Sequence, residues 1–284
     1  MIAIQPNFYP YSSIAKGIYI LDQHLRKDIH DCCIVDERDY VSTLMSYVRL
    51  FLRNSQLVKR LFSFQSQILN SNLEKKIGCD ALILFRAKNA VKVCMFEAKY
   101  PRLRKGTNYS WDYKTSSSNK AHFHDQLTRQ NKWSSEVAIW ELFINDYVPG
   151  FSLKGFDKYG STCIWHQDAY KYTEEKADAM SYPKDFVWNN KNLQECIEQL
   201  PYNPLNLEDV LISILIGKVG KVIPVTGNGL VTIKSSEEER IDIPVGSNIN
   251  RNDFMRLWET TGINNFLLVE LENISLNWDI DIDF

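Results

Sequence analysis

The sequence lacks the cysteine spacings that mark metal and redox motifs. It contains six cysteines among 284 residues, and none of them forms a Cys-x-x-Cys pair. This excludes a cysteine-based zinc framework and a thioredoxin-like redox motif. Cys79 and Cys94 lie within apolar stretches, where a cysteine usually behaves as a small buried hydrophobic residue.

Long hydrophobic runs and a strong excess of one charge are also missing. No apolar run approaches the roughly 20 residues that cross a bilayer, and the first residues show no charged segment followed by an apolar one. We therefore expect a cytoplasmic protein without a membrane partner. The formal net charge is −2, so nucleic-acid binding would have to come from a local basic patch.

What the sequence does contain is a strong hairpin signal at residues 77–101. Two apolar runs of strand length flank the short polar stretch Arg86–Asn89. With Lys88-Asn89 as the tight loop, and Asn89 the residue best able to take a positive φ, Asp80 faces Glu97 across the pair. Lys99 shares that face, because side chains two apart on a strand point the same way.

One face of this hairpin therefore combines two carboxylates with an ammonium group. Like charges that face each other on a sheet destabilise it, and apolar flanks increase the desolvation penalty. A divalent cation or a shared proton relieves that repulsion. Carboxylates for Mg²⁺, a metal-bound water and a nearby cation are the groups that phosphodiester hydrolysis needs. The alternative interpretation is a surface hairpin with a cross-strand salt bridge.

Two helices are expected before the hairpin. Apolar residues at helical spacing predict one over residues 36–54, with Asp36 as its cap and Glu37 in its first turn. Similar spacing predicts a second helix over residues 56–70.

After the hairpin, residues 121–134 return to helical spacing, with Gln126 and Gln130 one turn apart on the same face. The apolar run Val137–Ile144 fits either a strand or a continuation of that helix.

Asp80 followed by Glu97-Ala98-Lys99 after a hairpin resembles the PD-(D/E)XK nuclease superfamily. The resemblance covers residues 31–150, and Cys79 stands where the family often has proline. It implies an α/β, restriction-endonuclease-like core, made of a helix, a mixed β-sheet with a central hairpin, and a second helix. It also implies a Mg²⁺-dependent endonuclease, with Mn²⁺ as a substitute and with DNA rather than RNA as the substrate.

The resemblance assigns roles to individual residues. Those implied for metal binding are Asp80, Glu97, the backbone carbonyl of Ala98 and, as a further candidate, Glu37. Those implied for catalysis are Asp80, Glu97, Lys99 and Gln126.

Residues 102–120 lose all periodicity and mix basic, aromatic and hydroxyl side chains. Such a mixture suits a phosphate backbone and exposed bases. The candidate nucleic-acid-binding residues are Arg102, Arg104, Lys105, Tyr109, Trp111, Lys114 and Lys120. A mobile polar loop is the alternative.

Composition shifts suggest four parts: an N-terminal arm (1–30), the nuclease core (31–175), a polar linker (176–204) and an α+β C-terminal region (205–284). The last region ends in acidic residues, so we expect it to pack on the core, form a homodimer or bind a protein rather than nucleic acid. A catalytically silent nucleic-acid-binding or protein-interaction protein on the same fold is the alternative function.

Overall fold

The computed structural model describes residues 9–65, 77–103, 109–112, 121–144, 156–179, 186–271 and 278. No helix in these ranges is long and apolar enough to cross a membrane. The helices are α1 (Tyr9–His30), α2 (Glu37–Arg53), α4 (His122–Asn131), α5 (His166–Asp178), α6 (Asn190–Gln199), α7 (Leu207–Leu215) and α8 (Arg251–Thr261). The strands are β1 (Val58–Gln65), β2 (Ala81–Ala87), β3 (Ala90–Lys99), β4 (Arg102–Leu103), β5 (Tyr109–Ser110), β6 (Ala138–Phe143), β7 (Thr162–Trp165), β8 (Val222–Pro224), β9 (Leu230–Lys234), β10 (Arg240–Pro244) and β11 (Asn265–Leu271).

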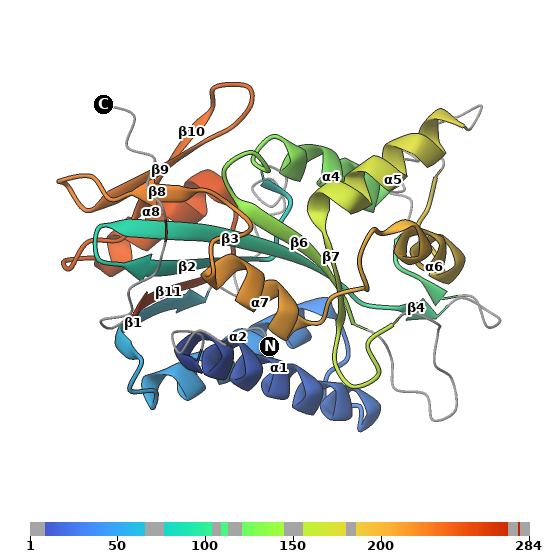
Figure 1. The fold of residues 1–284 in the computed structure, drawn as a ribbon, viewed down its shortest axis with the longest axis horizontal. Coiled ribbons are helices and arrows are strands. Elements are labelled where there is room, and N and C mark those ends of the chain that lie inside the picture. The colour runs from blue at the N-terminus through green and yellow to red at the C-terminus, as the bar shows by residue number, and fades with distance from the viewer. Residues whose placement is uncertain are drawn as a thin grey trace, which may run out of the picture.

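The fold is α/β and is built on one seven-stranded mixed sheet (Figure 1). The strand order is β1-β11-β2-β3-β6-β7, and β8 pairs with the start of β3. The β11–β2 and β3–β6 pairs are parallel, whereas β1–β11, β2–β3, β3–β8 and β6–β7 are antiparallel. The apolar run Val137–Ile144 is thus a strand at its centre, β6.

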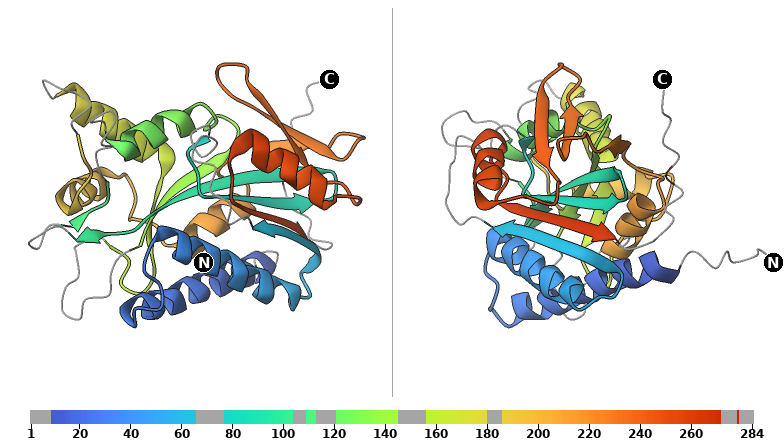
Figure 2. Two further views of the ribbon diagram at one scale, coloured as in Figure 1. Left: turned by 180° about the vertical axis from the view of Figure 1, so that it is seen from behind. Right: turned by 90° about the vertical axis from the view of Figure 1, so that its left-hand side faces the viewer.

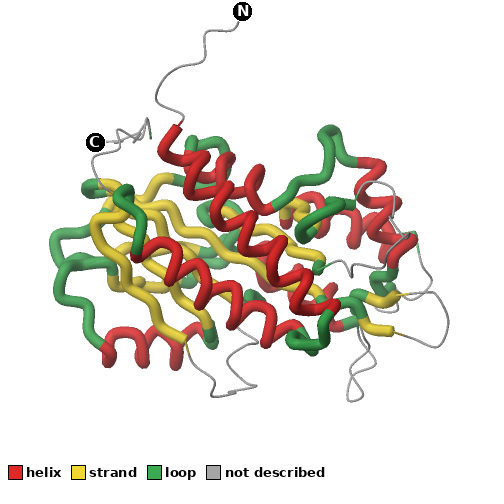
Figure 3. Tube along the Cα trace, turned by 90° about the horizontal axis from the view of Figure 1, so that it is seen from below, coloured by secondary structure: helices red, strands yellow, loops and turns green. Residues whose placement is uncertain are grey.

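Both faces of the sheet are covered, which explains why all of β3 and nearly all of β2 are buried. Helices α1, α2 and α7 pack on one face, and α8, the turn after α4 and the β9–β10 hairpin pack on the other (Figure 2). Figure 3, seen from the side of the first layer, shows its long helices crossing the strands. Along β3, Phe96 and Ala98 belong to the first core and Met95 to the second. Glu97 and Lys99 therefore point to the second face.

Residues 9–30 of the expected N-terminal arm form the helix α1, which packs on the core. Ile14, Ile18 and Leu25 of α1 are buried with α2 and α7. Asp22, on the same helix, is fully buried and accepts hydrogen bonds from Tyr40 and from both the amide and the hydroxyl of Ser161.

The helix expected over residues 56–70 is wrong in its described part, where residues 58–65 form β1. Phe62 and Phe64 project to the same side and stack on Phe254 of α8, with ring centroids 4.4 and 6.1 Å away. Two side chains two residues apart share a face of a strand and not of a helix, and pairing with β11 fixes this segment as a strand. Residues 66–70 lie outside the described residues.

The seven-stranded sheet contains strands from both sides of the expected linker at residues 176–204. The range 176–204 contains α6, which begins with a capping box between Asn189 and Asn192, and it buries Phe186 and Trp188. Strand β11, from the C-terminal region, lies between β1 and β2.

A chain that ends at Asn203 should therefore fail to fold, because it loses α7, β8 and the internal strand β11. We expect no cooperative transition when its urea denaturation is followed by circular dichroism. A chain that ends at Trp278 keeps every described residue and should unfold like the full-length protein. A soluble 1–203 fragment with a sharp transition would contradict this prediction.

Candidate active site

The hairpin has the register expected from the sequence. Its pairs run from Ala81–Phe96 to Ala87–Ala90 around the loop Lys88-Asn89. The positive φ falls on Lys88, at 52°, and not on Asn89 as expected. The loop still contains two residues, whichever of them has the positive φ. The pairing of residues across the hairpin is therefore the same as expected.

Asp80 lies immediately before β2 and is fixed against β3 by two hydrogen bonds. Its amide donates to the carbonyl oxygen of Phe96 over 2.9 Å, and its Oδ2 accepts from the amide of Ala98 over 2.8 Å. Ala98 therefore orients the carboxylate of Asp80. The role expected for the Ala98 carbonyl oxygen stays a prediction.

A third carboxylate reaches the same place from α2. Asp36 caps this helix by accepting from the amide of Asp39, which places Glu37 in the first turn. Glu37 Oε2 accepts from the amide of Tyr100 over 3.2 Å. One carboxylate oxygen each from Glu37, Asp80 and Glu97 all lie within 4.8 Å of one another. Three converging carboxylate oxygens are a donor set that suits a hard divalent cation such as Mg²⁺.

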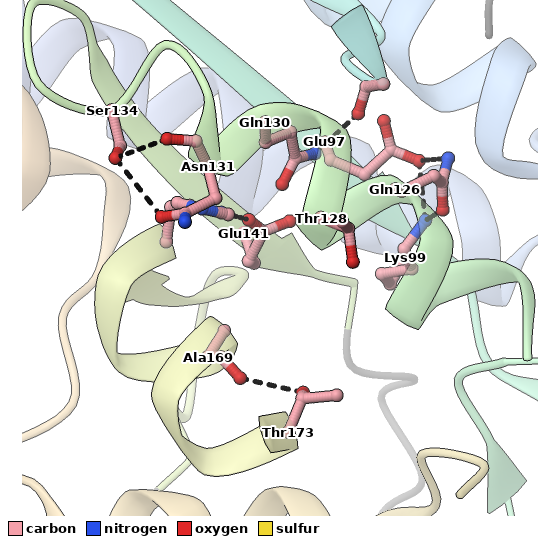
Figure 4. Close-up of polar contacts among 12 residues, drawn as sticks. Glu97, Lys99, Gln126, Thr128, Gln130, Asn131, Ser134, Glu141, Ala169 and Thr173 are labelled. Carbon is pink, nitrogen blue, oxygen red and sulfur yellow. Dashed lines mark hydrogen bonds and ion pairs between the residues drawn. The ribbon is translucent and has the colours of Figure 1, made fainter. Parts of the chain in front are cut away.

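Lys99 and Gln126 form a closed network with Glu97 (Figure 4). Lys99 Nζ lies 2.5 Å from Glu97 Oε1 and 2.9 Å from Gln126 Oε1. The amide nitrogen of Gln126 donates to the same Glu97 oxygen. The ammonium group also lies 4.8 Å from the ring centroid of Phe123, an additional favourable contact for a cation. Glu97 and Lys99 are almost fully buried, whereas Glu37 and Asp80 are half-buried.

Close packing of α4 on the start of β2 makes this network possible. Gly78 has a φ of 81°, and a Cβ there would lie 3.0 Å from the carbonyl oxygen of Gln126. The amide nitrogen of Gln130 donates to the Gly78 carbonyl oxygen. A glycine at this position lets the helix approach closely enough for Gln126 to reach Glu97.

The electrostatics of the site reflect an excess of buried negative charge. Burial, together with Asp80 and Glu37, raises the pKa of Glu97 well above its ordinary value, although Lys99 acts in the opposite direction. Burial alone would lower the pKa of Lys99, but Glu97, Glu37 and Asp80 outweigh it and raise that pKa. Burial also raises the pKa of the neighbouring Cys79 thiol. The site therefore favours taking up positive charge, either as a proton or as a cation.

The candidate nucleic-acid-binding residues have mixed outcomes. Arg102 and Tyr109 lie in the short paired strands β4 and β5. Trp111 is not available to stack on a base, because it is buried against Phe143 and Phe156 and donates to Asn190. Its role as a nucleic-acid contact is therefore wrong, since aromatic residues from distant segments cover it. The remaining candidates, Arg104, Lys105, Lys114 and Lys120, lie outside the described residues.

Sequence reasoning missed one polar pair beside this site. Glu141 of β6 is the register partner of Glu97 and is fully buried. His166, the first residue of α5, lies 3.0 Å from it. A single acid inside the apolar run Val137–Ile144 was the signal that could have identified Glu141.

The raised pKa of Glu97 predicts how stability depends on pH in the absence of metal. The folded state holds a proton that the unfolded chain has lost above the ordinary pKa of 4.5. The free energy of unfolding should therefore fall as pH rises from that value through the raised pKa. Glu97→Gln should remove this component. Urea denaturation in chelator at a series of pH values measures it.

Asp22 also has a raised pKa through burial and contributes with the same sign, so the difference between wild type and Glu97→Gln isolates the site. The same slope in both proteins would contradict the assignment.

No family model, no curated protein and no solved structure matches this chain. The function of the site is therefore interpreted from its own residues: three carboxylates, one lysine and one glutamine, gathered at the end of a buried hairpin.

Proposed function

We propose that this protein is a divalent-cation-dependent nuclease with a restriction-endonuclease-like core. The observation that carries the proposal is the convergence of Glu37, Asp80 and Glu97 beside Lys99. The arrangement of α2, the β2–β3 hairpin, α4 and a β6 strand parallel to β3 agrees with the core that the sequence resemblance implies. Strand β11, between β1 and β2, would be an addition to that core.

In this proposal Glu37, Asp80 and Glu97 would hold Mg²⁺, and Mn²⁺ could replace it. When bound, the ion supplies Lewis acidity and lowers the pKa of a coordinated water. Ala98 holds the Asp80 carboxylate in place through its amide. Glu97 would have to give up its proton to hold the ion, so cation affinity should increase as pH rises.

Lys99 has two tasks in the proposed reaction. Its ammonium group keeps Glu97 in position through the ion pair, and it provides positive charge where negative charge develops on the phosphate. Gln126 orients both partners, since it accepts from Lys99 and donates to Glu97. The half-buried carboxylates of Glu37 and Asp80 mark the side from which a phosphodiester would approach. We propose nucleic acid, and DNA rather than RNA, as the substrate.

Replacing the carboxylates tests the metal site directly. Asp80→Asn and Glu97→Gln should each weaken Mn²⁺ binding, measured by calorimetry, and abolish cleavage of plasmid, single-stranded DNA and RNA in Mg²⁺. Asp80→Asn should not lower the stability of the metal-free protein, because it removes like-charge repulsion. Asp39→Asn is the matched control, since Asp39 is an exposed acid in the same first turn as Glu37. Unchanged Mn²⁺ binding in both variants would refute the proposal. A wild-type protein that binds Mn²⁺ but cleaves no substrate would indicate a catalytically silent protein.

Lys99→Met should lower the cleavage rate by about 10² or more, the usual scale for one electrostatic group in an active site. DNA binding should largely remain. Lys92→Met is the matched control, because Lys92 is a buried lysine on the same strand that donates to the Val219 and Gly220 carbonyl oxygens instead. It should alter stability and leave the rate per folded molecule intact. Equal rates in wild type and Lys99→Met would place the chemistry elsewhere.

A further inference from the structure

Helix α4, which brings Gln126 to the site, begins at a residue that cannot cap it. Its N-cap residue is Ala121, whose methyl side chain accepts no hydrogen bond. By contrast, α2, α6, α7 and α8 each begin with an Asp or Asn whose side chain accepts from an amide in the first turn. A buried helix start needs such an acceptor, because its first amides have no partner within the helix.

The acceptor for α4 comes from another part of the chain. Asp112 Oδ1 accepts from the amide of Phe123, the second residue of α4, over 2.9 Å. A local N-cap side chain bonds to this same position in a helix. Asp112 is 2% exposed, and it lies two residues after the end of β5. It therefore caps α4 from outside the helix.

The position of Asp112 is fixed by contacts made without α4. The Ser110 hydroxyl donates to the Asp112 carbonyl oxygen over 2.6 Å and accepts from the Asp112 amide. Between these two residues, the Trp111 amide donates to the carbonyl oxygen of Trp188. The Trp111 ring packs edge-on against Phe143 at the end of β6. Asp112 is thus a fixed point against which the start of α4 is placed.

The residue whose amide binds Asp112 also contacts Lys99. The ammonium group of Lys99 lies 4.8 Å from the ring centroid of Phe123, an arrangement that attracts a cation. One turn further along α4, Gln126 accepts from the same ammonium group and donates to Glu97 (Figure 4). Both contacts come from the first half of α4, next to the bond with Asp112. Loss of a cap weakens the turn that it closes, so this end of the helix depends on Asp112.

We propose that Asp112 is a positioning residue of the site, which fixes the first turn of α4 so that Phe123 and Gln126 hold the Lys99 ammonium group beside Glu97. The role needs an acceptor oxygen and no negative charge. Asparagine should therefore serve in its place, as it does at the starts of α6, α7 and α8. This inference rests on the proposed function, because Lys99 acts in that reaction.

The test compares wild type, Asp112→Ala and Asp112→Asn in Mg²⁺, with whichever of plasmid, single-stranded DNA and RNA the wild type cleaves fastest. Asp112→Ala should lower kcat per folded molecule about tenfold and leave KM nearly unchanged, because Lys99 and Gln126 lose their alignment. Asp112→Asn keeps the acceptor and should recover most of the rate. Asn250→Ala is the matched control, since it removes the cap of α8, which contributes no residue to the site. It should alter stability and leave kcat intact.

Two further measurements separate positioning from a general loss of stability. In a Gln126→Ala background, Asp112→Ala should cost clearly less than in wild type, because one of the groups that it positions is absent. Hydrogen exchange followed by mass spectrometry, without metal, should be faster over residues 122–131 in Asp112→Ala and unchanged in Asp112→Asn. If Asp112→Ala does not fold, Asp112→Ser, with its shorter acceptor, should show the same losses to a smaller degree.

The outcomes distinguish this inference from the proposed function. Wild-type kcat in Asp112→Ala, equal losses in both backgrounds, unchanged exchange in α4, or no recovery in Asp112→Asn would each overturn the inference and leave the proposed function standing. A wild type that cleaves none of the three substrates would overturn both.

Discussion

The repulsion among carboxylates at the end of the β2–β3 hairpin is the interaction on which the site depends. Glu97 is buried beside Asp80 and Glu37, and burial and both neighbours raise its pKa. Lys99 offsets only part of this, because one ammonium group faces three carboxylates. The arrangement is unfavourable for stability, so the surrounding fold must hold it in place. A site with unbalanced negative charge is suited to binding a cation.

Three independent parts of the chain enforce this convergence. The sheet fixes Glu97 and Lys99, since β3 is hydrogen-bonded on both edges, to β2 on one side and to β6 and β8 on the other. The capped start of α2 brings Glu37, and the contact of Gly78 with α4 brings Gln126. Strand pairs and helix contacts thus fix the backbone positions from which these carboxylates converge. The strain of like charges is thereby maintained in the folded state.

The sequence predicted what depends on neighbours close in the chain. The hairpin register follows from a two-residue loop and two apolar runs, and it correctly brought Asp80, Glu97 and Lys99 together. The interpretations of β1 and Trp111 were wrong because distant segments decide them: β11 pairs with β1, and Phe156 packs on Trp111. Gln126 came from a family resemblance, and its reach to Glu97 depends on Gly78, which no local pattern reveals.

The two buried lysines of β3 show why Lys99 is best understood as part of a site. Lys92 donates to two backbone carbonyl oxygens, and burial lowers its pKa because those partners are neutral. Lys99 is buried as well, yet its pKa is raised, because its surroundings contain carboxylates. Backbone carbonyls are sufficient to accommodate a buried lysine in this fold, as Lys92 demonstrates. The carboxylates around Lys99 are thus more than its burial requires, and their surplus negative charge is what the proposed cation would offset.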